Sequence, residues 1–327
     1  MKAYGKLILV LLILLTVSGI AGAGTGKNLD IFNWKKAYFF NFYGICPLPT
    51  GQVWAVGSKG MICAFDTTSG QWVIQDSGFS RNLYDVAFVD QNTGWVAGQN
   101  GVILYSGNSG NTWTRQESGT SEHLFGTSFV DAKNGWAVGA YGTILHTEDG
   151  GVKWEKQGDQ IDRIYNDVFF VDAKNGWVVG EFGVILHSRD GGQTWEEQVN
   201  PLGERTLFSV YFTDPLNGHA SGMDGVLLET RDGGSSWTVI DSKTTENLFS
   251  VTAKGDGLWA VGLKGTFANQ VGGVWQDATE RIPTRAWLKQ CAFTDSKNGW
   301  IVGSVGTVLR TVDGGATWAP AFMAVPR

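Results

Sequence analysis

Cysteine is scarce in this chain, and its few cysteines follow no disulfide or metal-binding pattern. The 327 residues include only Cys46, Cys63 and Cys291. An odd number of cysteines is a poor disulfide framework, and no CxxC pair is present to hold a metal ion. All three fall within expected β-strands. We therefore expect buried free thiols, and neither a metal site nor a cofactor.

Helical periodicity and an excess of positive charge are also lacking. No long stretch repeats apolar residues every 3.6 positions, so helices are not indicated. The 25 Lys and Arg against 31 Asp and Glu give a net charge of −6, which disfavours nucleic acid and anionic membranes as partners. Ser/His/Asp triads, phosphate-binding loops and zinc patterns are missing, so no catalytic residue is predicted.

The longest apolar run lies at the start of the chain. Leu7 to Val17 follows Lys2 and Lys6 and precedes the small-residue stretch Ala21-Gly22-Ala23. This arrangement is typical of a secretory signal peptide, and the run is short for a membrane span. We expect residues 1–23 to be removed and the protein to be periplasmic or secreted. An uncleaved N-terminal anchor is the alternative.

The rest of the chain is rich in glycine and aromatic residues, and it repeats. A Trp marks the end of each unit, at intervals of 38 to 43 residues, and a second marker agrees with this spacing. A period near 40 with several strands per unit is typical of propeller blades. We predict an all-β fold, a seven-bladed β-propeller of four-stranded antiparallel blades over residues 40–327, preceded by a short arm at 24–39. The end markers are Trp72, Trp113, Trp154, Trp195, Trp237, Trp275 and Trp318.

The third unit shows the expected strands most clearly. Strand a covers Leu124 to Val130, and strands b and c flank a Gly-bearing turn at 139–142. Strand d begins at Trp154. An Asn-Gly dipeptide, here Asn134-Gly135, follows strand a, and we expect it to supply the positive φ of a tight hairpin. Whether the arm or the C-terminal end closes the last blade is left open.

A short motif of the type Ser/Thr-x-Asp-x-Gly-x-x-Trp separates strands c and d in five units. Its Asx side chain can accept hydrogen bonds from nearby backbone N–H groups while Gly takes the left-handed conformation. Identical carboxylates in successive blades would be an odd way to build one acid/base pair. We interpret them as structural. The Asx residues are Asn108, Asp149, Asp190, Asp232 and Asp313.

This motif resembles the Asp-box, or BNR, repeat of sialidases and other propellers. Together with strand endings of the type Phe-Val-Asp-x-x-x-Gly-Trp, as at Phe129 to Trp136, the chain is similar to the photosystem II stability/assembly factor family over about Phe40 to Trp318. The resemblance implies a protein-binding propeller that assists assembly of membrane complexes, without catalytic activity. Units 1 and 6 depart from the box pattern.

The resemblance also places the boxes on the face opposite the functional one. The d–a loops and b–c turns should then form the binding face, where Arg and aromatic residues suit a protein interface. Glu and Asp interleave with these Arg residues, so a merely solvated rim is the alternative. The candidate binding residues are Arg81, Arg163, Arg205, Arg281, Arg285, Tyr141 and Phe182. We expect a protein partner in the envelope or a membrane complex, and a monomeric scaffold.

Two other hypotheses can be weighed. His146 and His187 occupy the same position of adjacent units, but no further ligand accompanies them and the position reads as exposed strand, so metal binding is disfavoured. A glycan-binding or glycoside-hydrolysing, sialidase-like propeller is the alternative function. Arg281-Ile282-Pro283 resembles the sialidase arginine motif, but no arginine triad or Tyr/Glu nucleophile accompanies it.

Overall fold

A computed structural model describes residues 40–66, 69–158 and 161–321. Within these ranges, 28 strands form seven separate sheets of four strands each. In every sheet the strands follow chain order, and neighbouring strands run antiparallel, as in blade 3. The expected all-β class and seven four-stranded blades are thereby confirmed. The expected signal segment and arm, residues 1–39, lie outside the described part of the chain.

The strands of each blade are called a, b, c and d in chain order. Blades 1 to 4 comprise β1 (Phe42–Pro47), β2 (Val53–Gly57), β3 (Ile62–Asp66), β4 (Gln71–Gln75); β5 (Leu83–Phe88), β6 (Gly94–Gly98), β7 (Ile103–Ser106), β8 (Thr114–Gln116); β9 (Leu124–Phe129), β10 (Gly135–Gly139), β11 (Ile144–Thr147), β12 (Glu155–Lys156); β13 (Tyr165–Phe170), β14 (Gly176–Gly180), β15 (Ile185–Ser188), β16 (Glu196–Glu197). Blades 5 to 7 comprise β17 (Leu207–Phe212), β18 (Gly218–Gly222), β19 (Leu227–Thr230), β20 (Thr238–Val239); β21 (Leu248–Lys254), β22 (Gly257–Gly262), β23 (Phe267–Val271), β24 (Val274–Asp277); β25 (Leu288–Phe293), β26 (Gly299–Gly303), β27 (Val308–Thr311), β28 (Ala319–Pro320).

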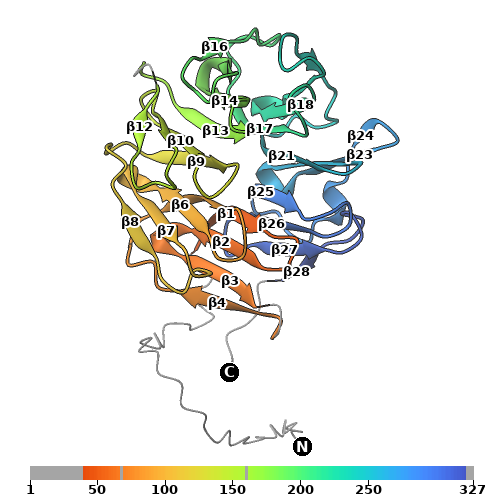
Figure 1. Ribbon diagram of the computed structural model, residues 1–327. Coiled ribbons are helices and arrows are strands. Elements are labelled where there is room, and N and C mark those ends of the chain that lie inside the picture. Colours follow the sequence, from red (N-terminus) through yellow and green to blue (C-terminus); the bar gives the residue numbers. More distant parts are fainter. Residues whose placement is uncertain (1–39, 67–68, 159–160, 322–327) are drawn as a thin grey trace, which may run out of the picture. The chain divides into compact units, whose positions relative to one another are not determined.

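The a strands contact one another in a closed cycle, β1–β5–β9–β13–β17–β21–β25 and back to β1. They surround the middle of the ring, and the d strands lie at its periphery (Figure 1). Blade 7 obtains its d strand, β28, from the C-terminal side of the chain. The N–H of Gly306 in blade 7 donates to the carbonyl oxygen of Phe40 at 2.7 Å, which joins the two ends of the described chain.

The inner edges of the a strands are satisfied by side chains rather than by another strand. An unpaired edge N–H costs free energy when it is buried. At five junctions, an a-strand N–H donates to the third residue of the preceding a strand. The pairs are Thr127 to Asp85 (2.7 Å), Val210 to Asp167 (3.0 Å), Val251 to Ser209 (3.4 Å), Cys291 to Ser250 (3.3 Å) and Ile45 to Gln290 (2.6 Å).

The other two junctions use an acceptor two residues further along. Their third residues are Gly44 and Gly126, where an added Cβ would lie 2.9 Å and 3.1 Å from the Cα atoms of the aspartates in the next blade. The Cys46 Sγ accepts the Phe88 N–H at 3.4 Å, and the Ser128 Oγ accepts the Phe170 N–H at 3.0 Å. Every blade junction therefore carries one such bond among the described residues.

Removing one of these acceptors should destabilise the ring. We expect Ser128→Ala to lower the free energy of unfolding by about 1–3 kcal/mol, because the buried Phe170 N–H loses its partner. Urea denaturation followed by tryptophan fluorescence measures this change. Ala87→Ser is the matched control, since blade 2 already uses Asp85 as its acceptor. Equal stability of Ser128→Ala and the natural protein would contradict the role of this hydrogen bond.

Aromatic residues form the core between blades. The strand-b Trp of one blade stacks on the Phe that ends strand a of the next blade, as Trp136 does on Phe170, with ring centroids 3.5 Å apart. The box Trp of that next blade, Trp195, meets the same Phe ring edge-on at 5.9 Å. Trp54, Trp95, Trp136 and Trp177 are fully buried. Burial of these large rings supplies much of the hydrophobic stabilisation.

The role expected for the Asn-Gly dipeptides is wrong. Gly135 and its counterparts do not have positive φ. Gly135 instead leaves room for an aromatic ring, because an added Cβ would lie 2.0 Å from the Phe129 ring. The turn is built by Asp131, whose Oδ1 accepts the N–H groups of Lys133 and Asn134 at 2.7 Å. Left-handed residues occur in the b–c turns instead.

Blades 1 and 6 replace the box with plain hairpins. In blade 1 the strands extend, so that Phe65 pairs with Trp72. In blade 6 they turn tightly at Gly272 and Gly273, both with positive φ. These are the two units whose sequences depart from the box pattern. The b strand that faces blade 6 carries the buried His219 where other blades have Trp.

The three cysteines are free, as predicted. Cys63 and Cys291 are buried, whereas Cys46 is half-buried. Burial raises the pKa of the Cys46 and Cys291 thiols to about 12, which leaves both protonated at neutral pH.

Candidate functional site

The loops divide between two faces of the ring. On one face a b–c turn meets the following d–a loop, since the Gly142 N–H donates to the Arg163 carbonyl oxygen at 2.8 Å. On the other face the box meets the a–b turn, since the Gly150 N–H donates to the Lys133 carbonyl oxygen at 2.9 Å. We call the first the loop face and the second the box face.

All five candidate arginines lie on the loop face, in or beside d–a loops. Arg81, Arg205 and Arg285 are exposed, and Arg163 and Arg281 are half-buried. The Arg163 Nη1 lies 3.3 Å from the Glu197 carboxylate, and the Arg281 Nε lies 3.7 Å from that of Glu280. Both ion pairs are partly solvated and contribute little stability. The arginines therefore share one face, while their role in binding stays a prediction.

The two candidate aromatic residues project from b–c turns. Tyr141 and Phe182 have φ values of 53° and 55°, and each precedes a Gly that also has positive φ. They are 56% and 61% exposed, which is unusual for large apolar side chains. The turn closes through backbone bonds, such as Val184 N–H to the Glu181 carbonyl at 3.3 Å. The side chain at this position thus points away from the blade and is available for contact.

Tyr141 also lines a pocket of about 370 Å³ on the loop face. Its walls come from the loop that enters blade 3, from that blade's b–c turn and from its strand d, and they include Thr120, Glu122 and Lys156. A pocket with one aromatic wall and charges of both signs suits a polar peptide side chain better than a purely apolar ligand. The sequence placed Tyr141 here but gave no signal for the pocket.

A polar cluster beside the a strands escaped the sequence analysis. Asp85 and Asp167 are acceptors of the inner ring, and Lys289 precedes the acceptor Gln290. Burial raises the pKa of both carboxyls, that of Asp167 to about 7, and repulsion between the two adds to the shift of Asp167. Burial lowers the pKa of Lys289, against the attraction of the two acids. The recurring acceptor at the third position of strand a was the available signal.

Asp167 should make stability depend on pH. Because its pKa is raised in the folded state, its stabilising contribution is present below about pH 4 and is lost as the pH rises towards 7. We expect Asp167→Asn, which keeps an acceptor for the Val210 N–H, to be more stable than the natural protein at pH 8 by about 1–2 kcal/mol. The difference should shrink towards pH 4.

Chemical denaturation at pH 4, 6 and 8 tests this expectation. Asp131→Asn is the control of opposite sign, because hydrogen bonds and Lys133 lower the pKa of Asp131 in the folded state despite slight burial. That variant should lose stability near neutral pH and not at low pH. A difference for Asp167→Asn that does not vary with pH would contradict the raised pKa.

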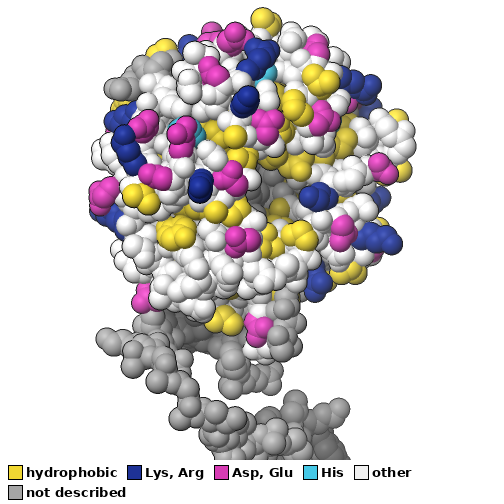
Figure 2. Space-filling view, in the orientation of Figure 1, with side chains coloured by type: hydrophobic (Ala, Val, Ile, Leu, Met, Phe, Trp, Pro, Cys, Tyr) yellow, Lys and Arg dark blue, Asp and Glu magenta, His cyan; other side chains and the backbone are white. Residues whose placement is uncertain are grey.

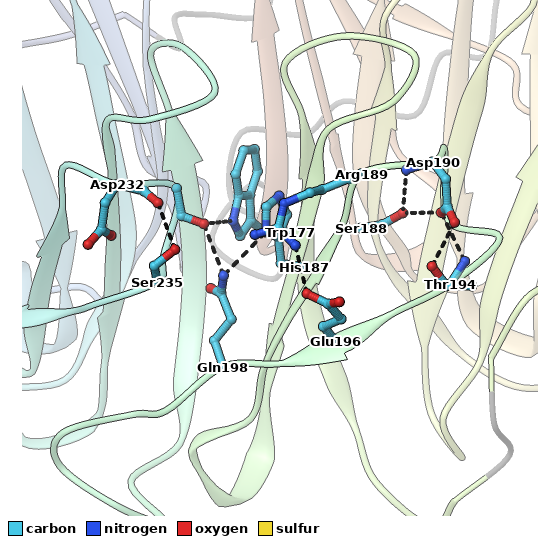
Figure 3. Close-up of polar contacts among 11 residues, drawn as sticks. Trp177, His187, Ser188, Arg189, Asp190, Thr194, Glu196, Gln198, Asp232 and Ser235 are labelled. Atoms are coloured by element: carbon cyan, nitrogen blue, oxygen red, sulfur yellow. Dashed lines mark hydrogen bonds and ion pairs between the residues drawn. The ribbon is translucent and has the colours of Figure 1, made fainter.

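On the box face, each Asp box closes on itself. In blade 4 the Asp190 Oδ1 accepts the Thr194 N–H at 2.9 Å and the Ser188 Oγ–H at 2.8 Å (Figure 3). The Ser188 Oγ also accepts the Gly192 N–H at 2.7 Å. Gly191 and Gly192 have positive φ. Hydrogen bonds from the Thr194 hydroxyl, the Thr194 N–H and the Ser188 hydroxyl hold the pKa of Asp190 below its usual value. Asn108, Asp149, Asp232 and Asp313 make the same contacts, which confirms the expected turn.

Side chains of the preceding blade hydrogen-bond to the backbone of the box, as blade 4 shows for the box of blade 5. Trp177 Nε1 and Gln198 Nε2 both donate to the Gly233 carbonyl oxygen of the next box, at 3.1 Å and 2.9 Å (Figure 3). The Gln198 Oε1 in turn accepts the Trp237 Nε1–H at 3.1 Å. The carboxylates of the boxes are thus engaged with their own turns, and the boxes connect neighbouring blades.

Loss of a box carboxylate should therefore reduce stability. We expect Asp190→Ala to lower the free energy of unfolding by about 1–3 kcal/mol, because backbone N–H groups lose their acceptor. Asp190→Asn should cost far less, since Asn108 makes the equivalent bonds to Thr112 in blade 2. Chemical denaturation of both variants measures the difference. An unchanged midpoint for Asp190→Ala would contradict the structural role.

His146 and His187 do not form a joint site. His146 stacks on Trp136 and His187 on Trp177, with centroids 4.7 Å and 4.5 Å apart. His187 is buried, so the expectation of an exposed strand position is wrong for it. Burial lowers the pKa of both rings, that of His187 to about 4. Among the described residues, no group of three His, Cys, Asp or Glu side chains could hold a metal ion.

Comparison with known proteins places the chain in a family. The family model for "Photosynthesis system II assembly factor YCF48" matches residues 64–160, 105–202 and 268–326, which together exceed half of the chain. The chain belongs to this family. No curated protein matches it.

Solved structures support the same fold. A structure described as YCF48 bound to D1 peptide is 20% identical, with a TM-score of 0.60, covering 73% of this chain and 80% of the other. YCF48 from Cyanidioschyzon merolae is 18% identical, with a TM-score of 0.69 and coverages of 83% and 95%. A GH74 xyloglucanase from Xanthomonas campestris is 14% identical, with a TM-score of 0.73, and the match covers 86% of this chain but 54% of the enzyme.

No helix in the described ranges is long and apolar enough to cross a membrane. The blades of this YCF48-family chain present two faces. The hydrogen bonds of the box face connect neighbouring blades, and the loop face carries exposed Arg and aromatic side chains.

Proposed function

We propose that this protein is an exported, non-catalytic scaffold whose loop face binds a protein partner during assembly of an envelope or membrane complex. Membership in the YCF48 family carries this proposal. YCF48 itself has a structure with a D1 peptide, so a propeller of this family binds a peptide. The proposal of export rests on the signal peptide expected for residues 1–23. We propose further that the propeller acts as a monomer.

The loop face supplies the contacts that such a partner needs. Exposed Arg205 and Arg285 carry positive charge, while Tyr141 and Phe182 offer apolar rings held outward by strained turns. Arg and aromatic side chains are enriched at protein interfaces. Acidic neighbours such as Glu122 and Glu280 moderate the charge and would favour a partner with a specific pattern rather than any acidic surface.

Reversing two charges should abolish partner capture. We expect Arg281→Glu with Arg285→Glu to lose the partner in an affinity pull-down from envelope extracts, because repulsion replaces attraction at the rim. The longest d–a loop carries both residues. Capture by the double variant at the natural level would remove this loop from the binding surface.

A matched double reversal on the other face controls for net charge. Lys133→Glu with Lys174→Glu alters two exposed a–b turns of the box face and should leave capture unchanged. Circular dichroism and tryptophan fluorescence check that all variants remain folded.

Glycan binding or cleavage is the alternative function, and the fold shared with the xyloglucanase is the observation that favours it. Release of fluorophore from fluorogenic glycosides would establish it and would set the scaffold proposal aside.

A further inference from the structure

The junction between blades 7 and 1 lacks a hydrogen bond that four other junctions make. At four other junctions the strand-b Trp donates its indole N–H to a backbone carbonyl oxygen in the next blade's box, at 2.9–3.1 Å. The donors are Trp95, Trp136, Trp177 and Trp259. A box turn therefore fills the space beside each of these rings.

Blade 1 has no box to offer Trp300. Its hairpin places Phe65 and Trp72 edge-on to the Trp300 ring, at centroid distances of 5.2 Å and 5.6 Å. The Trp72 Nε1–H donates to the Ala321 carbonyl oxygen at 3.0 Å. The Trp300 indole N–H has no hydrogen-bond partner in the described part of the chain.

A pocket of about 330 Å³ lies between the blade 1 hairpin, at Phe65 and Gly70, and strands c and d of blade 7. Phe65, Trp300, Val312 and Pro320 give it apolar walls. Arg310 stands at its rim, with its guanidinium carbon 5.2 Å from the centre of the Trp300 ring. Arg310 is exposed and makes no ion pair with any residue that the structure describes, unlike Arg189 and Arg231 in blades 4 and 5.

We propose that this pocket binds a peptide segment of another protein, in which an acidic residue adjoins an apolar one. A backbone carbonyl oxygen accepts the Trp300 N–H, as box carbonyls do at the four related junctions. The carboxylate pairs with Arg310, and the apolar side chain packs against Phe65 and Pro320. The site belongs to the box side of the blades, so it is separate from the loop face of the proposed function.

A peptide fits these groups better than other ligands. Three features converge on one pocket: an indole donor that pairs with peptide carbonyls elsewhere in the molecule, an unpaired guanidinium, and an apolar wall. A guanidinium placed over an aromatic ring can still offer N–H groups to a carboxylate, which can accept two of them.

Nuclear magnetic resonance of the indole N–H groups tests the proposal on the full chain. The probe is the peptide acetyl-Gly-Phe-Glu-Gly-Gly-amide, titrated to about 5 mM, a range suited to weak contacts. Trp300→Phe identifies the Trp300 signal. We expect that signal to shift and saturate, and the Gln-for-Glu peptide to bind at least about tenfold more weakly.

Protein variants give the second arm of the test. Arg310→Gln should weaken binding of the Glu peptide about tenfold, whereas Arg115→Gln, an exposed Arg in strand d of blade 2, should not. The proposal is wrong if the Trp300 signal does not move, or if the Gln peptide or Arg310→Gln binds as well as the natural pair. A shift of the signal on deleting residues 322–327 alone would identify this chain's own C-terminal segment as the occupant and overturn the peptide assignment.

Discussion

A sheet of four strands has two edges, and closing seven such sheets into a ring buries seven of them. The inner edges cannot pair with one another as strands, so their N–H groups need acceptors from side chains. Asp, Ser, Gln and one Cys supply these acceptors, one at each junction. Where glycine makes room for the aspartate of the next blade, the acceptor moves two residues along the strand, to Cys46 or Ser128.

The outer part of each junction solves a different problem with aromatic rings. A Trp and a Phe stack across the interface, and the indole N–H must still find a partner. The box provides a carbonyl oxygen, and a Gln from the preceding blade joins it at the same atom. Asp190 and its counterparts are therefore held by their own turns and by the ring's assembly. The carboxylates of the boxes on this face are thus engaged in structural hydrogen bonds.

Much of this architecture could be predicted from spacing alone. The Trp markers gave the blade number, and the box residues gave a turn whose bonds the structure confirms. The Asn-Gly dipeptides were misread, because the need for glycine there arises from the Phe129 ring packed above Gly135. The cluster of Asp85, Asp167 and Lys289 was missed for a different reason, because it joins residues from three blades and only the recurring polar residue in strand a hints at it. The loop face was located, and its pocket was not.

The b–c turns allow the side chains of the loop face to vary while its backbone stays the same. In each blade the turn is specified by a left-handed residue followed by Gly and by backbone hydrogen bonds, not by the identity of the outward side chain. That position holds Lys59, Asn100, Tyr141, Phe182, Asp224, Lys264 and Val305. Seven sites of nearly fixed geometry can thus exchange charge, aromaticity or amide without disturbing the scaffold, so a new recognition pattern can arise by single substitutions while the ring beneath stays the same.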